Sequence, residues 1–511
     1  MSKENVDDKL ASAPIAIKER SSLLSAFFSM PKAHQFLLFF LFFLPLQARI
    51  LKPFHKLAKL LTPSSLDLPS CFAKKILFYT SDLCFLAFLI AALSSLKIDW
   101  RRFFWNGPAK YLSALAIISL LSLLFSKIPY FPLQYVKLFQ YLLPFLLFCL
   151  IPYCFDARSF NPFLRNFFWA VFSISLLQSL IALVQYFTQD TLGLKFLGEP
   201  SHIKQFSFLA PGGIRWIFDQ LFHHSRGVDY ICRISGTMPH PNILGGFLFL
   251  GLMTSYTLYF EKYASRAKWV LLGGIFLQIS ALFLTFSRSA IIATTLGTLL
   301  WFYLISFRCR NALQANDIPP PKTPFWIKPL LAVKKILLPL IFTFLLGIGT
   351  CLTLFYTPLT HRGGVVNYNN NAQISDDERL TYQEVAVQMI EQHPLLGVGF
   401  NHFQIEMPKY GTKELTANLL SKVHNIYLLV YAEQGLLGLT AFLLFIFSVL
   451  RRSFRSAFNP FHASLFAAFI GYLFIGCCDF YLMRTNFMMF LFFGISAFLA
   501  APSLLANRPL A

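Results

Sequence analysis

Charged residues are scarce in this chain. Asp, Glu, Lys and Arg make up 13% of its 511 residues, whereas a soluble globular protein carries roughly a quarter. Hydrophobic residues make up 56%, and the mean hydropathy is +0.58. Each charge at the centre of a bilayer costs about 2.5–3.5 kcal/mol on insertion scales. The scarcity of charge excludes an ordinary soluble domain and predicts an integral membrane protein.

The sequence also lacks the motifs of common soluble enzymes. It contains no GxSxG, no P-loop and no dinucleotide-binding fingerprint. Its nine cysteines and eleven histidines show no metal-binding spacing such as HExxH. The residues therefore give no indication of a cofactor or a metal ion.

Acidic residues are few compared with basic ones. There are 23 Asp and Glu against 44 Lys and Arg, which gives a net charge of +21. In a soluble protein this excess would suggest nucleic acid. Here the basic residues cluster between hydrophobic runs, as they do in positive-inside loops. The sequence predicts the lipid bilayer as partner and no nucleic acid, and it leaves anionic lipids and lipid-linked substrates open.

The hydrophobic runs predict an all-α polytopic membrane protein with about twelve spans, because a spanning helix needs about 20 mostly apolar residues. The predicted spans are 33–50, 76–96, 109–127, 131–153, 166–187, 241–260, 268–286, 288–306, 335–356, 426–450, 461–479 and 485–503. The ends predict cytoplasmic tails at 1–32 and 504–511 around a transmembrane domain at 33–503.

Lys and Arg in alternate short loops set the predicted orientation. The basic loops assigned to the cytoplasm lie at 97–110, 158–165, 262–268, 308–328 and 451–455. The basic segment 49–75 argues against this assignment, because the count places it outside. Two long outer loops follow, at about 188–240 and 357–425, and the second precedes the tenth span.

Arg233 is the first candidate for a binding residue. It lies just before a helix predicted to open at Pro241-Asn242. The N–H groups and dipole at a helix N-terminus favour an anion, and an arginine adds a planar charged fork that suits phosphate. The alternative is an arginine that snorkels to lipid head groups.

Arg288 lies at the outer end of a helical hairpin with almost no loop. Its small neighbours Ser287, Ser289 and Ala290 permit close approach of helices, which favours an arginine that faces the protein. Interfacial snorkelling is again the alternative.

The second outer loop contributes two further candidates. His424 stands where the loop enters a membrane helix, and histidine can act as a general base near neutral pH. A histidine at such a position is more often a cap or an interface residue. Arg379 follows the acidic cluster Asp376-Asp377-Glu378, which indicates a solvated helix start rather than a metal site. Asp479, near the end of the eleventh span, is a functional candidate with no assigned role.

Taken in order, these segments resemble the O-antigen ligase and polymerase superfamily, which includes O-antigen ligases, O-antigen polymerases and bacterial protein O-oligosaccharyltransferases. The resemblance covers roughly residues 110–500. The matching segments are Gln185-Tyr186, Arg233 to Asn242, Thr285 to Ala290, Glu378-Arg379, Pro394 to Phe400 and His424 to Gly438.

The resemblance implies a membrane glycosyltransferase of the GT-C type in the bacterial inner membrane, with its active face in the periplasm. Such an enzyme moves a glycan from a polyprenyl-diphosphate carrier to an acceptor hydroxyl, on lipid A-core or a similar glycolipid, with inversion and without a metal or cofactor. By carry-over, Arg233, Arg288 and Arg379 bind the donor diphosphate. His424 acts on the acceptor hydroxyl.

Three alternatives remain open. An O-antigen polymerase or a protein O-oligosaccharyltransferase would use the same donor. A lipid or glycan transporter would instead carry ionisable residues inside its helices, and it would be built from internal repeats. The sequence shows few such residues and no internal repeat. The chain departs from typical members through an aromatic and histidine-rich stretch at 215–224, which leaves the donor and acceptor open.

Overall fold

The computed structural model describes most of the chain. The described residues are 31–43, 80–126, 131–156, 158–200, 204–207, 230–262, 264–315, 338–353, 370–410, 422–454, 459–483 and 485–501. The C-terminal tail, nearly all of the N-terminal tail, the basic segment 49–75 and the stretch 215–224 lie outside these residues.

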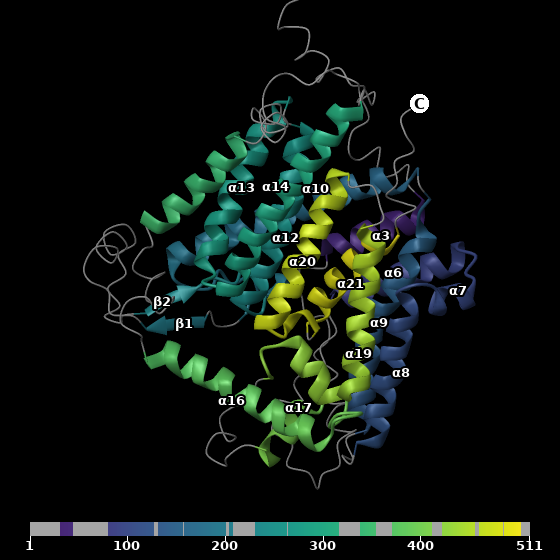
Figure 1. The fold of residues 1–511 in the computed structure, drawn as a ribbon. Coiled ribbons are helices and arrows are strands. Elements are labelled where there is room, and N and C mark those ends of the chain that lie inside the picture. Colours follow the sequence, from purple (N-terminus) through teal and green to yellow (C-terminus); the bar gives the residue numbers. More distant parts are fainter. Residues whose placement is uncertain are drawn as a thin grey trace, which may run out of the picture.

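Helices dominate the described residues (Figure 1). The longer ones are α3 (Lys32–Phe43), α6 (Thr80–Ser95), α8 (Ala109–Phe125), α9 (Phe131–Cys154), α10 (Phe160–Thr188), α12 (Pro241–Lys262), α13 (Ala267–Leu284), α14 (Arg288–Ala315), the helix Leu338–Thr353, α16 (Asn370–Gln392), α19 (Ile426–Phe454), α20 (Pro460–Cys478) and α21 (Asn486–Ala500). The short ones are α7 (Trp100–Trp105), η1 (Lys195–Leu197), α17 (Phe403–Glu406), η2 (Met407–Lys409) and η3 (Tyr481–Met483).

Each predicted span overlaps an apolar helix. Seven of these helices are long and apolar enough to cross a membrane: most of α9, all of α10, α12, α13, α19 and α20, and the first part of α14. The other five are apolar but shorter over the part of the chain that is described: α3, α6, α8, Leu338–Thr353 and α21. The structure thus supports a polytopic helical membrane protein, and the count of twelve spans stays a prediction.

One small sheet adds to the predicted all-helical architecture. The strands β1 (Lys204–Ser207) and β2 (Tyr230–Arg233) pair antiparallel, with Lys204 opposite Arg233. Strands of four residues carry too little periodicity to stand out in a sequence. Their pairing fixes the backbone at Arg233.

The helix α12 lies at the centre of the bundle, and nearly all of it is buried. It packs against α10, α13, α14 and α20. A Cβ added at Gly245 would lie 2.9 Å from the Cβ of Ala290, and one at Gly251 would lie 2.6 Å from the side chain of Ser175. Such close approach at small residues is typical of packing between membrane helices. It brings the start of α12 against the turn between α13 and α14.

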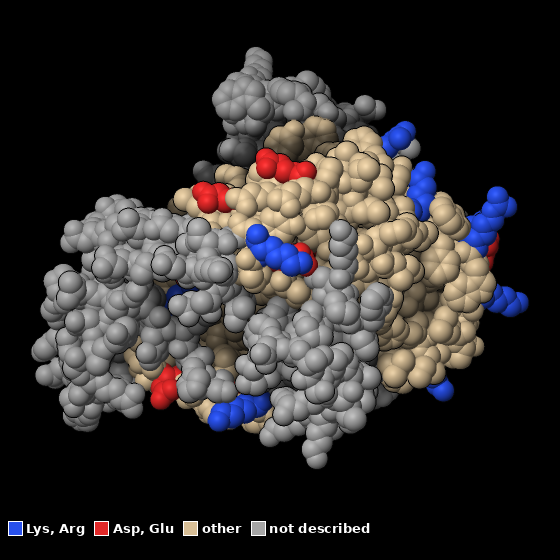
Figure 2. Space-filling view, turned by 90° about the horizontal axis from the view of Figure 1, so that it is seen from below, with Lys and Arg blue, Asp and Glu red and all other residues tan. Residues whose placement is uncertain are grey.

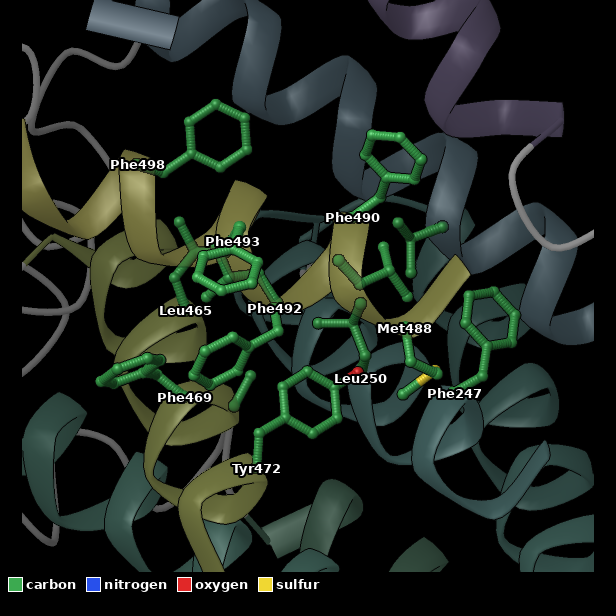
Figure 3. Close-up of a cluster of buried hydrophobic side chains, with 14 of the residues drawn as sticks. Phe247, Leu250, Leu465, Phe469, Tyr472, Met488, Phe490, Phe492, Phe493 and Phe498 are labelled. Carbon is green, nitrogen blue, oxygen red and sulfur yellow. The ribbon is translucent and has the colours of Figure 1, made fainter. Parts of the chain in front are cut away.

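Phenylalanine side chains fill the interior around α21. Figure 3 shows Phe492 and Phe493 of this helix beside Phe469 of α20. The rings of Phe469 and Phe492 are 5.5 Å apart, and Phe493 contacts Phe145 of α9 edge-on at 4.7 Å. Aromatic pairs of this kind contribute about 0.5–1.5 kcal/mol beyond the area they bury. Interdigitated rings therefore supply the packing that holds helices together in lipid.

The two ends of the bundle carry different predicted loops. At one end Arg452 donates to Asn106 Oδ1 at 3.4 Å and to the Ala500 carbonyl at 3.3 Å, so two loops predicted to be cytoplasmic meet there. The other end carries α16 and α17 (Figure 1). Figure 2 views the molecule from this end and shows charged side chains scattered among uncharged ones. The grouping of the loops agrees with the predicted topology, and the compartment that each end faces stays a prediction.

Candidate functional site

Arg233, at the end of β2, is only 7% exposed. Its Nε donates to the Thr285 carbonyl at 3.1 Å, and one terminal nitrogen donates to the same carbonyl at 2.9 Å and to Asn242 Oδ1 at 2.8 Å. A buried charge needs such partners, because leaving it unpaired is costly. These bonds turn the side chain into the protein, which rules out the snorkelling alternative for Arg233.

Two glutamines of α10 hold the segment that follows β2. Gln178 donates to Thr237 Oγ1 at 2.7 Å and accepts from the Thr237 amide at 3.0 Å. Gln185 accepts from the Gly236 amide at 2.8 Å and donates to its carbonyl at 2.9 Å. The two glutamines lie two helical turns apart and share one face of α10. Gly236 has a φ of +59°, which glycine adopts without strain. The match at Gln185 thus marks a residue that positions the loop.

Arg288 begins α14 directly after the turn Thr285-Phe286-Ser287. Phe286 has a φ of +50°, which a non-glycine residue keeps only where its surroundings hold it. Thr285 Oγ1 donates to the Leu282 carbonyl at 2.7 Å and accepts from the Ser287 amide at 3.2 Å. The turn is therefore fixed, and the exposed Arg288 side chain stands on a rigid backbone.

Asp479, which directly follows α20, connects these parts. Its side chain is buried, Oδ2 accepts from Asn242 Nδ2 at 2.7 Å, and Oδ1 accepts from the Phe480 amide at 2.8 Å. Because Asn242 also accepts from Arg233, a chain of hydrogen bonds runs from Asp479 to Arg233 and on to Thr285. Buried networks of this kind hold one geometry when all members are paired. Asp479, which had no assigned role from the sequence, thus anchors the hydrogen bonds that hold Asn242 and Arg233.

His424 lies just before α19 and contacts Phe480, the residue after Asp479. The capping of α19 falls to its neighbour Asn425, whose Oδ1 accepts from the amides of Tyr427 and Leu428 at 2.9 and 3.1 Å. The half-buried imidazole contacts the ring of Phe480 edge-on, with centroids 5.0 Å apart. The cap alternative is therefore wrong for His424, and its ring lies next to the residue that follows Asp479.

Arg379 completes the group from the side of α16. Arg288, Arg379 and Asp479 all lie within electrostatic range of Cys478, the last residue of α20. Arg379 is half-buried. The structure thus gathers all the predicted site residues around the turn at 478–480, which we call the hub turn.

The acidic cluster before Arg379 lies inside α16 rather than at its start, so the prediction of a helix start there was wrong.

The helix α19 is broken at Gly435, which has a φ of +67° and a ψ of −170°. The turn that follows α16 fills this break with main-chain hydrogen bonds in both directions. The Val398 amide donates to the Ala432 carbonyl at 2.9 Å, and the Leu436 amide donates to the Pro394 carbonyl at 2.8 Å. Two late sequence motifs therefore form one structural unit beside His424.

This unit contains a buried ion pair that was not predicted from the sequence. Lys422 is 1% exposed and Glu433 is 4% exposed, and the lysine Nζ pairs with Glu433 Oε1. Lys422 belongs to the predicted loop 357–425, where a charge normally faces water, and only the fold buries it. Glu433 lies inside the predicted span 426–450, and an ionisable residue at such a position was the signal that could have revealed it.

The charges at the hub turn are mainly guanidinium groups. Over the described ranges, no group of three His, Cys, Asp or Glu residues is placed to hold a metal ion. Guanidinium groups recognise phosphate through paired, charge-assisted hydrogen bonds. The arrangement is suited to binding an anionic phosphate compound beside an imidazole.

A protein family matches the part of the chain that carries three of the candidate site residues. Residues 273–443 match the family model described as O-Antigen ligase. The matched segment includes Arg288, Arg379 and His424, whereas Arg233 and Asp479 lie outside it. A comparison with curated proteins found no match. This match supports the O-antigen ligase superfamily, which the motifs predicted, over residues 273–443.

Proposed function

We propose that the protein is a lipid-linked glycan ligase. It transfers a glycan from a polyprenyl-diphosphate carrier to a hydroxyl of a glycolipid acceptor such as lipid A-core. The observation that carries this proposal is the convergence of three arginines and His424 around the hub turn. The family match supports the same class of reaction.

The arginines act on the donor diphosphate. Negative charge grows on the diphosphate as its bond to the sugar breaks, and fixed positive charges stabilise that state. Arg288 and Arg379 are accessible enough to reach phosphate oxygens. Arg233 adds its charge while its bonds to Thr285 hold the turn that carries Arg288. The polyprenyl tail stays in lipid.

His424 accepts the proton of the acceptor hydroxyl. As the proton leaves, the hydroxyl oxygen forms a bond to the anomeric carbon, and the bond from that carbon to the diphosphate oxygen breaks with its electron pair. Attack from the face opposite the diphosphate inverts the anomeric centre. Positioning and general-base catalysis together account for this chemistry, so the proposed mechanism is a GT-C-type transfer that uses no metal or cofactor.

The reaction is proposed to take place on the periplasmic face of the bacterial inner membrane. This assignment rests on the predicted topology, in which the basic loops at the opposite end of the bundle face the cytoplasm. The meeting of Arg452 with Asn106 at that opposite end supports it.

The product of a reconstituted reaction tests the proposal. Purified full-length protein in lipid nanodiscs is given a polyprenyl-diphosphate glycan and lipid A-core, and products are resolved by mass spectrometry. We expect glycan on the lipid A-core and free polyprenyl diphosphate. Longer glycan on the carrier would instead identify a polymerase. Absence of any covalent product would reject a transferase.

Lysine in place of Arg288 is expected to lower transfer by about 10- to 100-fold, because hydrogen bonds to charged groups are worth about 1.5–3 kcal/mol and lysine cannot bind phosphate in the same bidentate manner. The rate is measured in the nanodisc assay. Lys268→Arg, a basic position at the opposite end of α13 beside Trp269, serves as the control and should stay within about twofold. Equal rates for Arg288→Lys and wild type would show that Arg288 does not bind the diphosphate in a bidentate manner.

Alanine in place of Asp479 is expected to lower transfer by about 10- to 100-fold, because losing a buried hydrogen-bond partner costs about 1–3 kcal/mol and releases Asn242 and Arg233. Asp479→Asn keeps one acceptor and should lose less. The matched control is Asp156→Ala, which removes an exposed carboxylate bonded to Ser159. Equal losses in Asp479→Ala and Asp156→Ala would show that the network at the hub turn does not position the site.

A further inference from the structure

In the buried ion pair of Lys422 and Glu433, the ammonium group and both carboxylate oxygens make further hydrogen bonds. Lys422 Nζ also donates to Asn401 Oδ1 at 3.1 Å. The Glu433 carboxylate accepts from the amides of Asn401 and Phe403 at 3.0 and 3.3 Å. The neighbouring His402 is buried as well, and burial lowers its pKa. Lys422 is therefore the cation that balances Glu433.

This pair joins three segments of the outer end. Lys422 lies two residues before His424, and Glu433 lies on α19 just before its break. Asn401, from the turn that fills the break, connects onward through its Nδ2 to Gln134 Oε1 of α9 at 2.7 Å. The segment 422–425 is thus held at its start by Lys422. At its end Asn425 holds it by capping α19.

Stability alone does not explain an ion pair at this position. Two buried charges are often no more stable than apolar side chains of the same volume, because both must leave water. An ion pair with directional hydrogen bonds does define one geometry. The group whose geometry it defines is the short segment that carries the imidazole of His424.

We propose that Lys422 and Glu433 are positioning residues that fix the imidazole of His424 through the segment 422–425. The inference rests on the proposed function, in which His424 accepts the proton of the acceptor hydroxyl. The pair touches neither donor nor acceptor. It sets where the base stands, and small errors in the placement of a catalytic group cost up to about 100-fold in rate.

The test compares Glu433→Gln, which keeps the size of the side chain and removes its charge, in two backgrounds. In the wild-type background we expect kcat to fall about 10- to 100-fold with the KM for the donor within about twofold. In the His424→Ala background we expect no further loss, because residues that act through one group are not additive. Lys422→Arg, which keeps the charge, should recover part of the activity that Lys422→Met loses.

A second measurement follows the imidazole without catalysis. The rate at which diethyl pyrocarbonate modifies His424 is read by mass spectrometry, and Glu433→Gln should change it severalfold. The matched control is Lys409→Met, which breaks the ion pair of Lys409 with Glu406. The Lys409 side chain is 63% exposed. This variant should leave kcat and the modification rate within about twofold.

Two results would overturn the inference. One is an equal loss from Glu433→Gln in both backgrounds, and the other is an unchanged modification rate of His424 in Glu433→Gln. Failure of the proposed function has a different signature, since His424→Ala would then keep the wild-type rate while the modification rate still reports on the pair.

Discussion

Replacing His424 with alanine is expected to lower kcat for glycan transfer by about 10²- to 10⁴-fold, the usual contribution of a positioned general base. The KM for the polyprenyl-diphosphate donor should change little, because the imidazole contacts Phe480 and Tyr382 while the proposed diphosphate ligands are arginines. Initial rates in nanodiscs over a range of donor concentrations separate the two parameters.

The control for this variant is His393→Ala. His393 is exposed and directly follows α16, so its loss should leave kcat within about twofold. Wild-type turnover in His424→Ala would refute the base assignment. A rise in donor KM with constant kcat would place His424 at the donor instead.

Replacing Gly435 with alanine is expected to prevent the protein from accumulating in folded form. The backbone there has a φ of +67°, and an added Cβ would lie 2.1 Å from the carbonyl carbon and oxygen of Leu395. Backbone strain of this kind costs about 1–3 kcal/mol. The clash adds to it, because Leu395 can move only by breaking the main-chain bonds that fill the helix break. The sum is a large part of a typical stability of about 5–15 kcal/mol.

The yield of monodisperse protein after size-exclusion chromatography in detergent measures this effect, together with the Tm. Gly349→Ala is the matched control, since a Cβ at Gly349 meets nothing within 4 Å and the residue lies in the regular helix Leu338–Thr353. Its yield should equal that of the wild type or exceed it. A wild-type yield and Tm for Gly435→Ala would show that the break in α19 is not needed for the fold.

The helices were predictable because side-chain polarity alone decides where a chain enters lipid. The partners of Arg233 were not, since Thr285 lies 52 residues away and only the packing of α12 brings the two together. The same holds for Asp479, whose link to Asn242 spans 237 residues. A sequence shows that such polar groups exist near membrane helices, and it does not show which of them face each other.

The candidate site residues were predicted by their position at helix ends and by the order of motifs. Their roles depend on burial, which the sequence did not reveal. Lys422 is the clearest case, because it has the character of a loop residue in water and yet is buried against Asn401 and Glu433.

The filled break in α19 also bears on how the chain matures during synthesis. The turn at 394–399 leaves the ribosome before the helix α19 whose break it fills. The residues of α19 that bond to this turn extend to Leu437. In the predicted topology, the outer loop has already crossed the bilayer before the first half of α19 is inserted beside it. A nascent chain that stops short of this helix has all three arginines and the histidine, yet the turn has no break to fill. The unit made of this turn and α19 can therefore form only after α19 has been synthesised.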